Sequence, residues 1–491
     1  MKNDPLFELI KSLKQTEKSY FKKMAVSHKK NSDNNFLVLF NLIGKQKKYN
    51  EKKIKSILGD KHFAQKKKHL YEKVMESLRQ YHAKTNHLSL INTSLTDYNI
   101  LLSKSMLELA DKSLEKARIL SLKSESYYDL LKILNLKIEL LKNKNNVQEI
   151  EIHIDKYKTS VKKINQLIVD QIELEELYLS IIKWNKNIEW IRNKKEQQVF
   201  FKIFDHTLLK SNNTPISNRS KILYYYIKAI HCYLQSSFAE ALSFFQKELY
   251  VFNKEKWLKN ELSAYLRCLA NNCLLAIYEN NDEIYNECFN ELKEKRIETP
   301  LLKQLQYYYI KLLQLKKAFT DNKIKKAISI IEDSSESIKS IENDFFSKNI
   351  MYNEITIMSF VKIAIYLNSE QTKKALETSN YFLNNANKQL KIDSYALARI
   401  LNLLIHYELK HYDLLEYELI SAKKYFISNG RFLTFEKTMI KFLKDLLNTN
   451  EKREIHSLHE TLKTKLIELK KDPFEKVVLQ FYDFENWINK I

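Results

Sequence analysis

The sequence predicts an all-α protein, a right-handed solenoid of antiparallel helix pairs with a basic helical region at its N-terminus. The first observation is the scarcity of turn residues, with 3 Gly and 4 Pro in 491 residues. Average usage of ~7% Gly and ~5% Pro would give many times more of each. The second is apolar spacing of three and four residues over long stretches. The third is a pattern that recurs every 40–48 residues, as in helical-repeat arrays.

Residues 1–91 contain the start and stop signals of several short helices. Asp4 and Pro5 open the first as cap and first-turn proline, and Thr16 is expected to cap the second. The third is predicted over residues 36–43. Asn50 is expected to cap the fourth, which ends at Gly59 and Asp60. Its expected buried residues are Ile54, Ile57 and Leu58.

A longer helix is predicted over residues 63–82, followed from about residue 86 by long helix pairs. The clearest pair comprises ILYYYIKAIHCYLQSS and FAEALSFFQKELYVF, residues 222–252. This pair resembles a tetratricopeptide repeat. Phe238, Ala241 and Phe245 occupy the aromatic, small and aromatic positions of its second helix, and Ala229 the small position of its first. Small residues let paired helices approach closely.

The match to the repeat pattern is partial. Glu248 stands where the family has a small residue and Cys232 where it has an aromatic one. The small-residue position recurs along the chain at Ala110, Ala117, Ala327, Ala375 and, as a leucine, Leu415. The 40–48-residue interval exceeds the 34 of the standard repeat and predicts a long, degenerate version or a HEAT-like array.

The whole chain also resembles an uncharacterised family of bacterial helical-repeat proteins. The resemblance rests on SLKQTEKSYFKK, HLYEKVMESLRQYH, ILNLLIHYELKHYDLLEYEL and FYDFENWINKI. It implies a helical-repeat fold and carries no activity.

Composition predicts four regions. These are a basic helical region over 1–85, a first repeat sub-array over 86–210, a second over 221–447, and C-terminal capping helices over 448–491. The Pro215-containing segment 211–220 separates the sub-arrays. Asp472, Pro473 and Glu475 form a capping box that predicts a last helix from residue 472. Its expected apolar stripe is Val477, Phe481, Phe484, Ile488 and Ile491, with Trp487 beside it.

The basic charge is concentrated near the N-terminus. The net charge is +22, and residues 1–91 hold 21 Lys and Arg against 8 Asp and Glu. Lysines on helix faces can neutralise phosphates, so this region is a candidate site for nucleic acid or another acidic partner. The alternative is a solvated lysine face in a lysine-biased chain. The candidate patch is Lys45, Lys47, Lys48, Lys52, Lys53, Lys55, Lys66, Lys67, Lys68, Lys73 and Arg79.

Patterns for enzyme chemistry are weak. GxGxxG, GxxxxGK[ST] and GxSxG motifs are absent, which argues against Rossmann, P-loop and α/β-hydrolase sites. Arg399 and His406 have the Arg-x6-His spacing of the HEPN ribonucleases. A partly buried structural pair is the favoured interpretation, because apolar Ile400 follows the arginine. Paired histidines lack further ligands. We expect no catalytic residue, cofactor or metal, and no enzyme activity.

The abundant aromatic residues suggest a groove for a protein partner. Tyr225, Tyr265 and Tyr308 are the candidate groove aromatics, with Trp184 and Trp190 as further candidates. The alternative is that these rings fill gaps between helices. The four cysteines have no CxxC spacing and are expected to be buried free thiols. Without a signal peptide or an 18-residue apolar run, the sequence predicts a cytoplasmic adaptor with no membrane contact.

Overall fold

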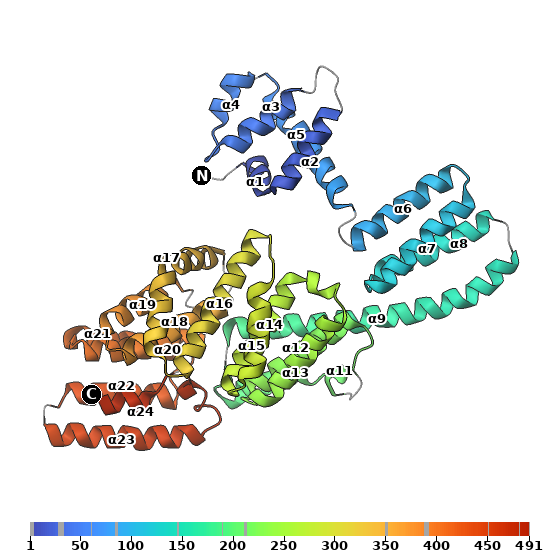
Figure 1. The fold of residues 1–491 in the computed structure, drawn as a ribbon. Coiled ribbons are helices and arrows are strands. Elements are labelled where there is room, and N and C mark those ends of the chain that lie inside the picture. Colours follow the sequence, from blue (N-terminus) through green and yellow to red (C-terminus); the bar gives the residue numbers. More distant parts are fainter. Residues whose placement is uncertain are drawn as a thin grey trace. The chain divides into compact units, whose positions relative to one another are not determined.

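The computed structural model describes residues 4–27, 34–59, 61–83, 87–144, 147–188, 190–210, 214–348, 352–386, 392–449, 451–480 and 482–490. Within these ranges the protein is all-helical, with twenty-four α-helices, two short 3₁₀ helices and no β-strand (Figure 1). The prediction of an all-α fold is therefore confirmed.

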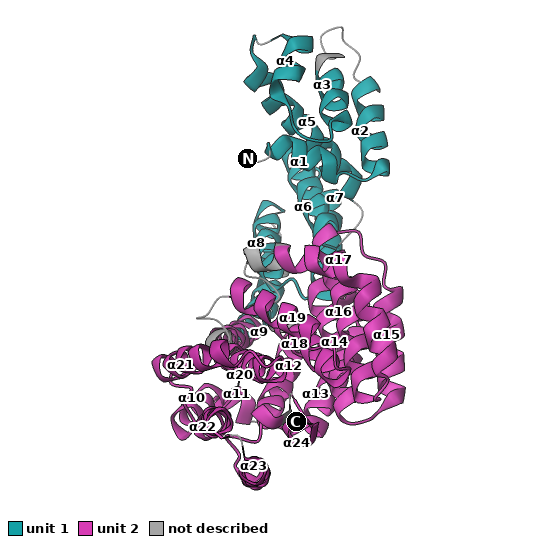
Figure 2. Cartoon of the chain, turned by 90° about the vertical axis from the view of Figure 1, so that its left-hand side faces the viewer, with its two compact units in different colours: residues 1–166 teal, residues 167–491 magenta. Residues whose placement is uncertain are grey.

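The chain divides into two compact units, residues 1–166 and 167–491, coloured separately in Figure 2. The first unit contains α1 (Pro5–Ser12), α2 (Gln15–Ser27), α3 (Asn34–Lys45), α4 (Glu51–Leu58), α5 (Phe63–His82), α6 (His87–Ser103), α7 (Leu107–Lys123) and α8 (Tyr127–Asn143). The division falls within α9 (Val147–Asn187). The four regions predicted from composition stay a prediction.

The second unit contains the remaining helices, drawn from green to red in Figure 1. They are α10 (Lys194–Phe204), α11 (Thr207–Lys210), α12 (Asn218–Leu234), α13 (Phe238–Lys254), η1 (Leu258–Asn260), α14 (Leu262–Tyr278), α15 (Asp282–Glu294), α16 (Pro300–Thr320), α17 (Ile324–Lys348), α18 (Tyr352–Asn368), α19 (Thr372–Asn385), α20 (Ile392–Glu408), α21 (Tyr412–Ser428), α22 (Thr434–Leu447), α23 (Lys452–Lys471), η2 (Val478–Gln480) and α24 (Phe484–Lys490).

The caps of the first helices follow the expected residues with one exception. Asp4 Oδ1 accepts hydrogen bonds from the amides of Leu6 and Phe7, at 3.0 and 3.2 Å, and Asn50 Oδ1 accepts from Lys53 N at 3.1 Å. Thr16 lies inside α2 and does not cap it.

The structure also shows which face of α4 is buried and where the next helix begins and ends. Ile54 is buried as expected, whereas Ile57 is 56% exposed, so its placement in the core was wrong. Three apolar residues on an eight-residue helix leave that choice open, because only one face of α4 contacts the neighbouring helices. The helix predicted over 63–82 is α5, with the same bounds.

The small-residue positions occupy helix–helix contacts. Ala110, Ala117, Ala229, Ala241, Ala327, Ala375 and Leu415 are all 0% exposed. The four cysteines are free and buried, as predicted. Glu248, which stands where the repeat family has a small residue, is also fully buried.

Helices of the second unit pack in two ways. Consecutive helices form pairs, such as α12 with α13, α18 with α19 and α20 with α21. In addition, every second helix contacts the next, from α14 through α16, α18 and α20 to α22. The even-numbered helices from α14 to α22 thus form one continuous layer, and the odd-numbered helices α15 to α21 pack against it.

The last helix does not begin at residue 472, so that prediction was wrong. Asp472 accepts a hydrogen bond from Phe474 N at 2.7 Å, but turns and the 3₁₀ helix η2 follow, and α24 starts only at Phe484. The expected capping box fails because the Glu475 carboxylate binds Arg192 instead. Phe484, Trp487 and Ile488 are buried and Val477 packs against the core, whereas Phe481 and Ile491 lie outside the described residues.

Candidate functional site

The structure separates the predicted basic patch into two groups. Four members have partners within the protein: Lys55 with Glu51, Lys66 with the Leu58 carbonyl, Lys67 with Asp4 and Glu51, and Lys73 with Glu76. The other seven are exposed, namely Lys45, Lys47, Lys48, Lys52, Lys53, Lys68 and Arg79. Five of these seven fall within residues 45–53, at the end of α3 and the start of α4.

Arg399 and His406 each have structural neighbours of their own. The Arg399 guanidinium lies over the rings of Tyr395 and Tyr425, at 5.5 and 5.1 Å, and donates to Ser421 Oγ. His406 is 5% exposed and its Nδ1 lies 3.3 Å from His411 Nδ1. Burial lowers the pKa of His406. Across the described ranges, no three His, Cys, Asp or Glu side chains gather closely enough to hold a metal ion.

Two of the three predicted groove tyrosines belong to the core, which corrects that prediction. Tyr265 and Tyr308 are 0% exposed, and Tyr308 Oη donates to Glu342 at 3.0 Å. Trp184 and Trp190 are also buried, at 8% each. Tyr225 is half-buried beside a surface hollow formed by α12 and α13.

A cavity of about 150 Å³ does open among the helices of the second unit. We call it the Arg267 cavity. Its walls include Tyr226 of α12, Phe245 of α13, Arg267 and Leu274 of α14, Tyr309 of α16 and Ile357 of α18. Most of the lining therefore comes from the continuous layer of even-numbered helices. Tyr226 and Tyr309 each follow a tyrosine that was predicted for the groove, and one residue along a helix rotates a side chain by about 100°.

Arg267 is the only charged residue in the sequence of α14, LSAYLRCLANNCLLAIY. Its guanidinium carbon lies 4.3 Å from the centroid of the Tyr226 ring and 5.6 Å from that of Tyr178. A hydrogen bond of 2.8 Å runs from its Nη1 to Tyr178 Oη. The Arg267 Nε is inaccessible to solvent and has no hydrogen-bond partner in the described part of the chain.

Glu248 of α13 interacts electrostatically with Arg267 and is 0% exposed. Neither of its carboxyl oxygens has a hydrogen-bond partner among the described residues. Burial raises the pKa of Glu248 to about 8, and the Arg267 charge offsets only part of that effect. The Cys268 thiol lies close but points toward the Phe245 carbonyl, with Sγ 4.0 Å from that oxygen. The carboxyl group is therefore mostly protonated at neutral pH.

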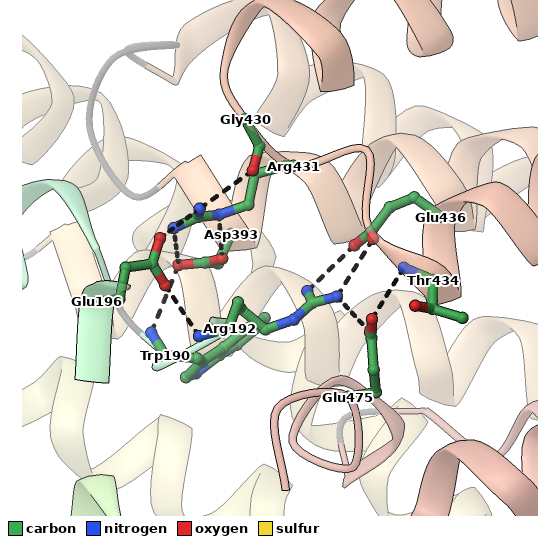
Figure 3. A network of polar contacts seen from close by, with 9 residues as sticks. All are labelled: Trp190, Arg192, Glu196, Asp393, Gly430, Arg431, Thr434, Glu436 and Glu475. Atoms are coloured by element: carbon green, nitrogen blue, oxygen red, sulfur yellow. Dashed lines mark hydrogen bonds and ion pairs between the residues drawn. The ribbon is translucent and has the colours of Figure 1, made fainter. Parts of the chain in front are cut away.

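A second buried polar arrangement joins distant parts of the second unit (Figure 3). Arg192, between α9 and α10, binds Glu436 of α22 through both terminal nitrogens, at 3.1 and 3.2 Å, and Glu475 at 2.7 Å. Arg431, between α21 and α22, binds Asp393 and Glu196, both at 2.6 Å. These six side chains, which we call the Arg192–Arg431 network, are between 0% and 11% exposed.

Backbone groups complete this network. Trp190 N donates to Asp393 Oδ2 at 3.4 Å, Arg192 N to Glu196 Oε2 at 2.9 Å, and Thr434 N to Glu475 Oε1 at 2.8 Å. Burial lowers the pKa of Arg192, but the carboxylates of Glu436 and Glu475 outweigh it and raise the pKa overall. Arg192 Nε is buried without a hydrogen-bond partner among the described residues, whereas both terminal nitrogens of Arg192 are paired within the network. Most polar groups of the network therefore have partners inside the protein, as is usual for buried polar groups.

Sequence reasoning found neither arrangement. The network pairs residues up to 283 positions apart, and no local spacing signals such a contact. Two signals did exist for the cavity, the lone charge of α14 and the acid at Glu248 in place of a small residue. No described helix is both long and apolar enough to cross a membrane.

Comparison with protein-family models, with curated proteins and with solved structures finds no match.

Proposed function

We propose that this protein is a non-enzymatic adaptor that binds a protein partner along the helical-repeat surface of its second unit, at the Arg267 cavity. The observation that supports it is a cavity whose walls come from four successive even-numbered helices and α13. Concave, mostly apolar sites with a few placed polar groups are the usual form of a binding site. Repeat arrays commonly bind partners along an extended concave surface, and most of the lining of this cavity comes from α12, α14, α16 and α18.

The finer fold proposed here is a right-handed solenoid of antiparallel helix pairs, similar to tetratricopeptide repeats with long and degenerate units. Support comes from the contacts of each even-numbered helix with the next and from the buried small residues at the recurring position. Each pair then buries its apolar face against its neighbours, so several pairs are needed for a stable array.

The adaptor function predicts a specific loss of partner binding when the cavity is filled. Leu274 lines the cavity and keeps part of its surface accessible. Leu274→Trp should occupy most of the cavity volume and reduce partner recovery at least ~10-fold, because a blocked apolar pocket removes the central contact. The measurement is affinity capture with the full chain from a lysate of the source organism, quantified by mass spectrometry.

The matched control is Leu414→Trp, the same substitution at a 46% exposed position on α21. Wild type and control should both recover one partner in stoichiometric amount. Recovery of chaperones alone, or equal recovery with Leu274→Trp, would contradict the proposed function.

Nucleic-acid binding through the first unit is the second candidate. The observation in its favour is the run of exposed Lys45, Lys47, Lys48, Lys52 and Lys53 across the end of α3 and the start of α4. Side chains placed in this way suit contact with a phosphate backbone, whereas base-specific recognition mostly uses arginine, asparagine or glutamine. We therefore expect little dependence on sequence.

If this second function holds, the full chain should bind duplex or single-strand probes, with affinity falling steeply between about 50 and 200 mM salt. Replacing Lys47, Lys48, Lys52 and Lys53 together by glutamine should lower affinity at least ~10-fold and flatten the salt dependence, because each lost phosphate contact removes about 0.9 from the slope. Fluorescence anisotropy measures both quantities.

The same change in charge elsewhere provides the control. Lys325, Lys326, Lys441 and Lys444 are exposed on the second unit, and their fourfold glutamine variant should bind as wild type does. Equal weakening by both variants would indicate a non-specific effect of net charge, and no binding at low salt would exclude the function.

A further inference from the structure

Two cations, Arg267 of α14 and Lys316 of α16, have no carboxylate partner among the described residues, and Arg267 lines the cavity. In the described part of the chain neither side chain forms an ion pair within 4.0 Å. Both are partly buried, and Arg267 is a lining residue of the Arg267 cavity. Charges in such surroundings are normally paired, since desolvating an unpaired charge is costly.

Neighbouring tyrosines hold Arg267 in place. The Tyr226 ring stacks against one face of the guanidinium, with the ring centroid 4.3 Å from Cζ. Tyr178 accepts the hydrogen bond from Nη1. The side chain is thus fixed at the cavity wall with donors to spare, because a guanidinium carries five N–H groups.

Lys316 adds a second positive charge near the Arg267 cavity. It lies three and four residues after Leu313 and Leu312, which line the cavity, and so shares their face of α16. Its Nζ lies 4.9 Å from the centroid of the Tyr278 ring. Burial lowers the pKa of Lys316 to about 8, and a bound anion would raise that pKa again.

The acid nearest to Arg267 does not neutralise it. Glu248 is fully buried and its carboxyl group is mostly protonated at pH 7. Arg267 in the cavity wall, and Lys316 on the same face of α16 as the lining residues Leu312 and Leu313, therefore have no compensating negative charge at neutral pH. An anionic ligand would supply the missing charge.

The Arg267 cavity suits one aromatic ring. Its volume of about 150 Å³ is similar to that of an engineered apolar cavity that binds benzene. The apolar faces of Tyr226, Tyr309 and Leu274 form its walls. Asn271 lines it as well, and an Asn amide can both donate to and accept from a peptide group.

We propose that the Arg267 cavity binds an internal segment of a partner polypeptide in which an aromatic residue is flanked by aspartate or glutamate. The ring enters the cavity, one carboxylate pairs with Arg267, and Lys316 attracts the other. This proposal rests on the proposed adaptor function and specifies the chemistry of the partner.

The test uses the full chain and three peptides whose ends are acetylated and amidated. The first has the sequence Asp-Phe-Asp-Ala, the second Asn-Phe-Asn-Ala and the third Asp-Ala-Asp-Ala. Saturation-transfer NMR and calorimetry should show binding of the first peptide with a Kd of about 1 mM or tighter, in line with its size. Each of the other two should bind at least ~10-fold more weakly, because each lacks either the charges or the ring.

Variants assign the two contributions. Arg267→Leu should remove most of the preference for the acidic over the neutral peptide and leave only the part due to Lys316, whereas Arg267→Lys should retain more of it. Lys316→Met should lower the same preference without affecting the cavity. Leu274→Trp should abolish binding of both phenylalanine peptides, and Leu414→Trp should not.

Absence of saturable binding by the first peptide at concentrations up to about 5 mM would overturn this inference, and so would equal affinity for the neutral peptide. The adaptor function would survive that result if partner capture still depended on Leu274. Conversely, peptide binding without any captured partner would support the site chemistry and remove the adaptor function.

Discussion

Replacing Arg192 with methionine is expected to destabilise the second unit by about 3–5 kcal/mol, the cost of leaving buried charges without their partner. Glu436 and Glu475 are 1% and 5% exposed and share this one guanidinium. Arg431 cannot replace it, because it binds Asp393 and Glu196. Loss of Arg192 would also free Glu475, whose other oxygen accepts the Thr434 amide at the start of α22.

Urea denaturation followed by helical circular dichroism measures the loss, and hydrogen exchange locates it. Exchange should accelerate most in residues 431–440 and 472–480, where the network holds backbone segments together. Arg118→Met is the matched control, because Arg118 forms an exposed pair with Glu115 and its loss should cost less than about 1 kcal/mol. Equal denaturation midpoints for Arg192→Met and wild type would refute the assignment.

A double variant separates the two parts of this cost. Adding Glu436→Leu to Arg192→Met removes one of the stranded charges and should restore part of the lost stability. Replacing a whole buried ion pair with apolar residues is often nearly neutral, whereas removing one partner is not. If the double variant were less stable than Arg192→Met, the attraction between the charges and not their desolvation would dominate.

The second large effect is a pH-dependent gain in stability in Glu248→Gln. The pKa of Glu248 is about 8 in the folded protein and near 4.5 when the group is in water. Between these values the folded state binds more protons than the unfolded state, so Glu248 reduces stability as pH rises from about 4.5 to 8. Each pKa unit corresponds to about 1.4 kcal/mol, so the penalty at pH 7 is on the order of 3 kcal/mol.

Glutamine has nearly the same shape and does not titrate in this range. The stability difference between Glu248→Gln and wild type should therefore be small near pH 4.5 and grow steadily toward pH 8. Arg267 and Cys268 face Glu248, and neither is expected to make the free energy of unfolding depend on pH between about 4.5 and 8. Burial keeps the pKa of the Cys268 thiol well above its usual value. Urea midpoints measured at intervals of one pH unit provide the test.

Glu287→Gln, at an exposed position on α15, should leave the pH dependence unchanged. A constant difference between Glu248→Gln and wild type from pH 5 to 8 would mean that the buried carboxyl group is already charged. Arg267 would then already have a negatively charged neighbour in Glu248, which would weaken the case for an acidic partner at the Arg267 cavity.

The basic patch shows what can and cannot be predicted from a single sequence. Exposure of Lys45, Lys47 and Lys48 agreed with a basic patch, but the same composition also supplied Lys66 and Lys67, which hold the first unit together. Composition counts charges and does not reveal which of them already have partners.

The tyrosines that line the Arg267 cavity could not be identified from the sequence either. Tyr225 and Tyr308, the middle residues of Tyr224–Tyr226 and Tyr307–Tyr309, were predicted to line a groove. Only the packed structure shows that Tyr226 and Tyr309 line it while Tyr308 is buried. Three successive rings cover most of a helix circumference, so their order cannot identify the face.

Local sequence was enough to predict the all-helical fold, the caps at Asp4 and Asn50 and the positions where helices approach closely. Those features depend on residues within one or two turns, as at Asp4, Asn50 and Ala241. Two features became visible only in the tertiary structure. Glu475 binds Arg192 and does not complete the expected capping box, and Arg267 lies close to a protonated Glu248. Both outcomes depend on contacts between segments distant in the chain, where burial and charge pairing outweigh local preference.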